Sequence, residues 1–335
     1  MVGSTARPGV RRGDVSEEPR RWLLIAVLVA VRMPASTQTR CADDQRCLCT
    51  LVEKIDGDLD GEDSQVPSFE CYDNDFPTLI VHSQWPSTSC IIQLGALRSP
   101  VAKYIEILAK GKIILIPWAF SDVGRELENL KLCCTLETIP DDAFGGLDQL
   151  RELHLSHNQL QTVNQRTFDH LPRLVVLYLD DNQLETIHDE AFDGLRKLKI
   201  LRLVKNRLKT VSHTMFSHLS HLVALNLGHN QLETIPDDAF LGLGQLKFLV
   251  ISSNRLTSLN ATLVIHLSHL SALSLEDNPL ACDCRLAWMQ TMATNVTVSG
   301  VCTSPPTAKD QSITSYDVSQ CDPDKPTNAG IDIVS

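Results

Sequence analysis

Pairs of acidic residues recur along the chain at a spacing that general acid–base catalysis could use. They are Asp141 with Asp142, Asp189 with Glu190, and Asp237 with Asp238. A catalytic pair is needed only once, whereas each of these pairs precedes an Ala-Phe dipeptide in a similar segment. Acidic residues at the start of a short helical turn cap open N–H groups and face the positive end of its dipole. We therefore interpret the acidic pairs as structural.

Two pairs of histidines are spaced three residues apart, so that one helical face could present both rings to a metal ion. They are His218 with His221 and His266 with His269. Neither pair belongs to a His-Glu-x-x-His segment with its general base. The sequence also contains no Gly-x-Ser-x-Gly, no phosphate-binding glycine loop and no plausible Cys/His nucleophile pair. It therefore predicts a protein that is not an enzyme and has no cofactor or metal.

Most of the eleven cysteines lie toward the two ends of the chain, where they could form disulfides or bind zinc. The terminal groups are Cys41, Cys47, Cys49 and Cys71, and Cys282, Cys284, Cys302 and Cys321. Their placement suggests disulfides that close the ends of a repeat array, which implies an oxidising compartment. Zinc is the alternative for the first four. Because Cys90, Cys133 and Cys134 are left over, at least one thiol is free or pairs between chains.

The elements that position these residues are predicted from a motif that occurs six times between residues 150 and 280, L-x-x-L-x-L-x-x-N-x-L. Its asparagines recur at a constant interval, at Asn158, Asn182, Asn206, Asn230, Asn254 and Asn278. A second ladder with the same period is Phe144, Phe168, Phe192, Phe216 and Phe240. This is the leucine-rich repeat signature. It predicts an α/β solenoid, a horseshoe with inward leucines, a parallel concave β-sheet, and asparagines that satisfy backbone groups at the turns.

The region before the repeats follows the pattern poorly. Phe120 lies one repeat period before Phe144, but Leu127, Leu130 and Leu132 are one position out of register. Residues 102–117 fit no repeat, and an insertion or a gene-assembly error could explain them. Counting back by the same period places Cys133 or Cys134 where the repeat asparagine should stand.

The terminal cysteines resemble the caps of extracellular leucine-rich repeat proteins. The resemblance implies the bridges Cys41–Cys49, Cys47–Cys71, Cys282–Cys302 and Cys284–Cys321. It also implies that Trp288 closes the apolar end of the last coil. From cap to cap the pattern resembles the variable lymphocyte receptors of jawless vertebrates and related invertebrate immune-type repeat proteins. Slit-like and Toll-like ectodomains share the same coil and C-terminal cap.

The remaining boundaries follow from composition. Residues 1–38 are expected to be a secretory signal peptide, because two arginines precede an apolar run about half the length of the ~20 residues that span a bilayer. A signal anchor is the alternative. We then expect a cysteine-rich N-terminal cap at 39–90, degenerate first repeats with an insertion at 91–135, and 24-residue repeats at 136–278. A cysteine-rich C-terminal cap at 279–321 and a disordered tail at 322–335 follow.

A binding surface is expected at the outward-facing strand positions, because the repeat motif does not determine which residues occupy them. The central column is His154, Tyr178, Arg202, Asn226, Val250 and Ser274. The flanking columns are Ser156, Asp180, Val204, Gly228, Ser252 and Glu276, and Glu152, Val176, Ile200, Ala224, Phe248 and Ala272. Candidate ligand-binding residues are Glu152, His154, Val176, Tyr178, Asp180, Ile200, Arg202, Val204, Asn226, Phe248 and Val250. They combine an apolar and aromatic band with ionic groups that commonly anchor protein interfaces.

These features predict a secreted recognition protein that binds a protein or glycan ligand through the concave face, and the resemblance implies an immune-type role. The alternative is an adhesion or guidance-type ligand or co-receptor for a cell-surface receptor. The net charge of -11 argues against a nucleic-acid partner. Membrane association is expected only through a partner. The sequons at Asn260 and Asn295 predict glycosylation, and the oligomeric state is left open.

Overall fold

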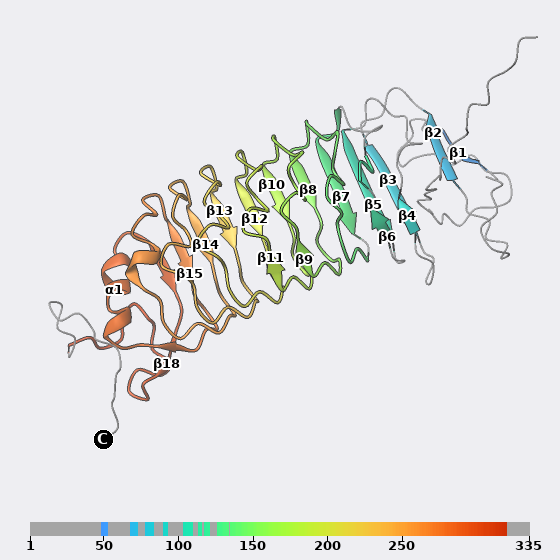
Figure 1. Cartoon of the computed structure of the whole chain (residues 1–335). Helices are drawn as coiled ribbons and strands as arrows, with labels where there is room; N and C mark the ends of the chain where they lie inside the picture. The colour runs from blue at the N-terminus through green and yellow to red at the C-terminus, as the bar shows by residue number, and fades with distance from the viewer. Residues whose placement is uncertain are drawn as a thin grey trace, which may run out of the picture.

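The computed structural model describes residues 48–52, 68–72, 78–83, 90–92, 103–109, 113–115, 117–120, 126–133 and 135–319. The predicted signal peptide and the predicted tail at 322–335 lie outside the described residues, as do Cys41 and Cys47. The described chain winds into an elongated coil with its longest strands side by side (Figure 1). Among these residues, no helix has the length and apolar character needed to cross a membrane.

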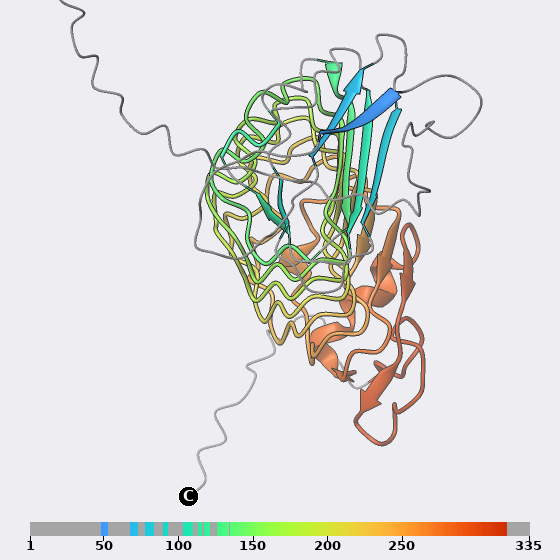
Figure 2. The same cartoon turned by 90° about the vertical axis from the view of Figure 1, so that its right-hand side faces the viewer.

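Ten strands form one sheet, and every neighbouring pair in it is parallel. In order along the coil they are β3 (Thr78–Ser83), β5 (Tyr104–Ala109), β7 (Asn129–Cys133), β8 (Glu152–His154), β10 (Val176–Tyr178), β12 (Ile200–Arg202), β13 (Ala224–Asn226), β14 (Phe248–Val250), β15 (Ala272–Ser274) and β17 (Thr297–Ser299). Viewed along the coil, the sheet occupies one side and the return segments occupy the other (Figure 2). Parallel neighbours need such long return connections. These ten strands therefore form the predicted leucine-rich repeat solenoid.

Shorter pairs of strands complete the described part. β1 (Leu48–Val52) and β2 (Ser68–Tyr72) are antiparallel, with Cys49 opposite Cys71. β4 (Cys90–Ile92) pairs with β6 (Ile113–Leu115), and β9 (Thr162–Val163) pairs with β11 (Thr186–Ile187), both in parallel. Because Cys41 and Cys47 are not described, the bridges Cys41–Cys49 and Cys47–Cys71 stay predictions.

The core is built from two ladders that run through the coils. The consensus leucines are buried; Leu153 and Leu155, for example, are fully inaccessible. The second ladder is aromatic and consists of Phe120, Phe144, Phe168, Phe192, Phe216 and Phe240. Neighbouring rings have centroids 6.1 to 6.3 Å apart, so each coil packs its phenyl ring against the next. Val264, one repeat period beyond Phe240, is also buried and takes the aromatic position in the last repeat.

Each repeat asparagine joins its own coil to the coil before it. In Asn206, Nδ2 donates to the carbonyls of Leu179 at 3.0 Å and Leu203 at 3.1 Å, and Oδ1 accepts from the N–H of Leu184 at 3.0 Å. The same bonds recur at the other five asparagines. The residue before each asparagine has a φ between 53 and 60°, which turns the chain out of the strand. The predicted role of the asparagines is confirmed.

The sheet extends into the region that follows the repeat pattern poorly. Thr78, Tyr104, Asn129 and Glu152 are in register, so the interval between successive strands varies here. The interval from Asn129 to Glu152 is one residue shorter than the regular repeat. Ile105 and Ile107 are fully buried and pair with Leu130 and Leu132, which continue the leucine ladders. Residues 104–109 therefore belong to the solenoid as strand β5.

This register corrects the position assigned to Cys133. Leu130 pairs with Leu153, and Asn158 stands five residues beyond Leu153. The corresponding residue five beyond Leu130 is Thr135, whereas Cys133 ends strand β7. The expectation that Cys133 or Cys134 takes the asparagine position is wrong because this coil is one residue shorter than the regular repeat. Cys133 has a free thiol, and burial raises its pKa.

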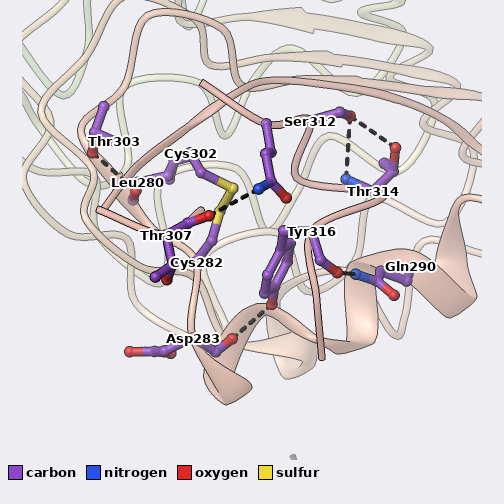
Figure 3. The surroundings of a disulfide bond; sticks show 11 residues. Leu280, Cys282, Asp283, Gln290, Cys302, Thr303, Thr307, Ser312, Thr314 and Tyr316 are labelled. Atoms are coloured by element: carbon purple, nitrogen blue, oxygen red, sulfur yellow. Dashed lines mark hydrogen bonds between the residues drawn. A yellow bond between two sulfur atoms is a disulfide. The ribbon is translucent and has the colours of Figure 1, made fainter. Parts of the chain in front are cut away.

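The C-terminal end of the coil is closed by a compact, cross-linked segment (Figure 3). It contains η4 (Cys284–Leu286), α1 (Trp288–Met292) and β16 (Leu280–Ala281), which pairs with β18 (Cys302–Ser304). The predicted bridge Cys282–Cys302 is present. Cys284 is also disulfide-bonded, and its predicted partner Cys321 lies outside the described residues.

Two aromatic residues tie this segment to the last coil. Trp288 packs against the core and donates from its ring nitrogen to the carbonyl of Leu259 at 3.4 Å. Tyr316 is buried, and its hydroxyl donates to the carbonyl of Asp283 at 2.6 Å (Figure 3). Burial, with a smaller contribution from the Asp283 charge, raises the pKa of Tyr316 to about 12.

Replacing one repeat asparagine should destabilise the solenoid much more than replacing an exposed neighbour. Asn206→Ala leaves two carbonyls and one N–H without their side-chain partner inside the coil, at a cost of about 2–4 kcal/mol. Lys205→Ala, at an exposed position, should change the free energy of unfolding by less than about 0.5 kcal/mol. Urea denaturation followed by circular dichroism measures both. Equal effects would contradict the bridging role.

Alkaline pH should weaken the C-terminal segment through Tyr316. Its pKa is raised in the folded state, so the stabilisation is present below pH 10 and is lost as pH rises toward 12. The free energy of unfolding of the wild type should therefore fall between pH 10 and pH 12. The decrease should be smaller in Tyr316→Phe, which lacks the titrating hydroxyl. Identical pH profiles for the two proteins would assign the decrease to other groups.

Candidate binding surface

The outward positions of the parallel strands form a continuous surface, called the sheet face below. In β8, β12, β13, β14 and β15 the middle residue is buried and its two neighbours are accessible. The strand pairing places Glu152, Val176, Ile200, Ala224, Phe248 and Ala272 in one column. It places His154, Tyr178, Arg202, Asn226, Val250 and Ser274 in the next. The predicted register of both columns is confirmed.

The apolar band expected on this face is only partly exposed. Phe248 is 49% exposed, with Ala224 and Ala272 beside it on the neighbouring strands. Val176 is only 8% exposed, although it occupies an outward column between Glu152 and Ile200. The expectation that Val176 is an exposed anchor is therefore wrong, since its larger neighbours limit solvent access to the short valine side chain.

Three planar side chains stack along the central column. The rings of His154 and Tyr178 are tilted against each other with centroids 4.5 Å apart. The guanidinium carbon of Arg202 lies 5.5 Å from the centroid of the Tyr178 ring, within the range of a cation–π interaction. Strands β8, β10 and β12 each supply one member of this stack. Ordered Tyr and Arg side chains on an open face are suited to bind a protein surface.

Asp180 fixes the arginine of this stack. Its carboxylate lies 2.8 Å from Nε of Arg202 and accepts the N–H of Val204 at 2.9 Å. Burial raises the pKa of Asp180, while the Val204 N–H and Arg202 oppose that shift. Because the guanidinium of Arg202 is half exposed and has five N–H donors, it can bind a partner while it is paired with Asp180.

His154 is held close to carboxylate and aromatic neighbours. Burial lowers the pKa of His154, and Glu152, whose carboxylate is 3.6 Å from Nε2, opposes the shift. Because the pKa of His154 lies below its usual value of 6.5, the ring is mainly neutral at pH 7.

The sheet face continues onto β5 and β7 with residues that the repeat pattern did not identify. Glu106 lies 2.6 Å from Nζ of Lys131 and accepts a hydrogen bond from the hydroxyl of Tyr104 at 3.0 Å. Lys131 pairs in register with His154, so this cluster adjoins the aromatic stack. Polar and apolar residues alternate in Tyr104-Ile105-Glu106-Ile107. This alternation predicts a strand whose isoleucines face the core and whose Tyr104 and Glu106 face outward.

The opposite half of the sheet face has small and uncharged side chains from β13 to β15. Oδ1 of Asn226 accepts the N–H of Gly228 at 3.0 Å. A Cβ atom at Gly228 would lie 3.1 Å from this oxygen and 3.3 Å from the hydroxyl of Ser252, so the chain is tightly packed here. Phe248 is the large apolar side chain that stands out from this half.

Some members of the acidic and histidine pairs in the return segments make contacts between coils. Oδ1 of Asp142 lies 3.0 Å from Arg166 and 2.9 Å from Nε2 of His170. Nδ1 of His218 lies 2.9 Å from Asp193. Within the described part of the chain, no three His, Cys, Asp or Glu side chains gather as metal ligands would. One member of the first acidic pair and one member of the first histidine pair therefore link neighbouring coils.

The two sequons lie at exposed positions outside the sheet face. Asn260 precedes η3 (Ala261–Leu263), where its side chain accepts the N–H of Thr262 and donates to Asp237 at 3.0 Å. Asn295 follows α1 and is also exposed. Glycosylation of both residues stays a prediction.

Comparisons with known proteins agree with this architecture. Residues 125–184, 172–232 and 220–280 match the sequence model described as Leucine rich repeat. A chain of the solved octameric complex of Latrophilin 3, Unc5D and FLRT2, in which FLRT2 contributes leucine-rich repeats, has 27% identity and a TM-score of 0.52. That alignment covers 65% of this chain and 76% of the other. A chain of the Drosophila Toll–Spatzle complex has 19% identity and a TM-score of 0.47, covering 65% of this chain and 42% of the other.

No curated protein matches the sequence significantly, whereas 462 chains of solved structures do. A fold shared so widely does not identify a ligand, which depends on the residues of the sheet face. Residues 125–280 carry the leucine-rich repeat, and the fold that they build is a leucine-rich repeat solenoid.

Proposed function

We propose that this protein is a secreted recognition protein that binds a protein partner through the sheet face. The observation that carries the proposal is the ordered cluster of His154, Tyr178, Arg202 and Asp180 at its centre. Repeat packing requires none of these residues, because the buried leucines and asparagines already hold the coils together. Because the packing of the coils does not require this cluster, its side chains are available to bind a partner.

The chemistry of the face suits a folded protein better than a small polar molecule. Tyr178 and Arg202 are of the types that most often dominate protein interfaces. Phe248 adds an exposed apolar side chain two strands beyond Arg202, at ~10 Å by ordinary strand spacing. One partner surface can therefore contact the ionic half and the apolar half together. The similar FLRT2-containing structure, a complex of several proteins, supports a protein as the partner.

Two observations support the proposal that the protein is secreted: its disulfides and the signal peptide expected from the sequence. The Cys282–Cys302 bridge and the disulfide at Cys284 fit an oxidising compartment. The signal peptide expected at 1–38 gives the route. An immune-type role and the adhesion or guidance-type alternative differ in where the partner is found, on a foreign surface or on host cells. A glycan ligand on the same face is the other alternative.

The central cluster should dominate affinity for the partner. The double variant Tyr178→Ala with Arg202→Glu removes the ring and reverses the charge beside Asp180, so binding to the recognised surface should weaken about 30-fold or more. Arg255→Glu is the matched charge reversal at an exposed ion pair with Glu233, and it should change affinity less than about threefold. Binding of the secreted protein to panels of microbial surfaces and host cells, with circular dichroism of each variant, measures this. Equal affinity of the double variant and the wild type would exclude the sheet face.

Acidification should weaken the same interaction through His154. Because the pKa of His154 is lowered by burial, its ring is neutral in the free protein at pH 7, and burial by a partner further disfavours the charged form. Affinity should therefore be constant from pH 7.5 to 6.5 and fall toward pH 5, with a smaller fall in His154→Gln. The pH dependence of the dissociation constant measures this. An unchanged profile in the variant would show that His154 does not lie in the interface.

A further inference from the structure

One coil of this acidic protein is strongly basic. Residues 196–209 contain no acidic residue and seven exposed basic residues, namely Arg196, Lys197, Lys199, Arg202, Lys205, Arg207 and Lys209. The whole chain has a net charge of -11, so the concentration of positive charge in this coil is local. Its cations are distributed on both sides of strand β12 and on the sheet face.

Three of these cations face carboxylates of the preceding coil. The pairs are Arg202 with Asp180 at 2.8 Å, Lys205 with Asp181 at 3.5 Å and Arg207 with Glu185 at 3.8 Å. Arg202 lies at the end of β12, and Lys205 and Arg207 follow it. Three of the four cations on this side of the coil are therefore balanced within the solenoid, and the fourth, Lys209, takes part in none of the ion pairs formed by the described residues.

The cations that precede β12 have no such balance. Arg196, Lys197 and Lys199 take part in none of the ion pairs formed by the described residues. Together with two exposed cations of neighbouring coils, they form what we call the basic rim: Arg173, Arg196, Lys197, Lys199 and Lys247. The four segments that lead into β10, β12, β13 and β14, at 170–176, 194–200, 218–224 and 242–248, contain no acidic residue.

The register spaces these cations along one edge of the sheet, the edge from which the strand arrows start (Figure 1). Ile200, Ala224 and Phe248 are in register, so Lys199 and Lys247, which directly precede two of them, lie two strands apart. That separation is ~10 Å by ordinary strand spacing, and the rim from the coil of Arg173 to that of Lys247 spans roughly 15 Å. Lys197 occupies the position in the adjacent coil that is equivalent to Arg173.

We propose that the basic rim binds a sulfated polysaccharide that runs across the coils beside the sheet face. Neighbouring like charges without counter-charges repel one another, and an extended polyanion relieves that repulsion and releases its own counterions. The net charge of -11 argues against a nucleic acid as this polyanion. This ligand is additional to the protein partner of the proposed function and binds independently of it.

The test compares two pairs of substitutions that remove the same charge from opposite sides of one coil. Lys197→Gln with Lys199→Gln removes cations of the basic rim, and Lys205→Gln with Arg207→Gln removes cations that already have carboxylate partners. Binding of the full secreted protein to heparin is measured by calorimetry at several salt concentrations. The first pair should weaken binding roughly tenfold near 0.15 M salt and flatten its salt dependence, because two anion contacts are lost. The second pair should change it less than twofold.

Equal losses in the two variants would overturn the proposal, since binding would then follow net charge rather than the rim. So would the absence of heparin binding by the wild type. Equal affinity for hyaluronan, which has carboxylates and no sulfate groups, or for duplex DNA would overturn the choice of a sulfated polysaccharide. Tyr178→Ala should leave heparin affinity unchanged while it weakens binding of the protein partner, so the failure of either proposal is recognised separately.

Discussion

The side-chain amide of the repeat asparagine is the interaction on which this solenoid depends. At the end of each strand the backbone turns inward, and carbonyl and N–H groups there cannot pair within one coil. Asn206 satisfies two carbonyls and one N–H from its own and the preceding coil, and five further asparagines do the same. Since an unpaired buried group costs about 1–3 kcal/mol, the asparagine must recur at one place in every coil. That requirement fixes the constant length of the coil and therefore the strand register.

The same constraint explains how far the sequence predicts the fold. Where the asparagine recurs, counting residues gives the strands, the phenylalanine ladder and the sheet. Before Asn158 the described coils hold the leucine positions with Ile105, Ile107, Leu130 and Leu132, and the coil of β7 has Thr135 at the asparagine position. Apolar residues alone tolerate coils that are one residue shorter or up to two residues longer than the regular repeat, because a core accepts isoleucine for leucine and a small change in a return segment. The pattern consequently assigned Cys133 to the wrong place.

For the candidate site, the sequence predicts which residues share a column but not how their side chains interact. Register alone places Tyr178 beside His154 and Arg202. The tilt of the two rings and the Asp180–Arg202 pair depend on side-chain conformations that the repeat does not specify. Solvent exposure also depends on the neighbouring side chains. Val176 and Phe248 occupy one column, but only Phe248 is exposed, because the residues beside it on the neighbouring strands are the small Ala224 and Ala272. The cluster at Tyr104, Glu106 and Lys131 was missed since it precedes the regular repeats.

The distribution of charge in the coil at 196–209 separates the two surfaces physically. Acids of the preceding coil pair with Arg202, Lys205 and Arg207, so the ionic groups at and beside the centre of the sheet face carry little net charge. The cations before β12 form no ion pair among the described residues, so they attract anions over about 8–10 Å at physiological salt. A protein partner bound at Tyr178 therefore depends weakly on salt, while a polyanion along Lys199 and Lys247 depends on it strongly. Two ligands can use adjacent surfaces of one coil because different interactions hold them.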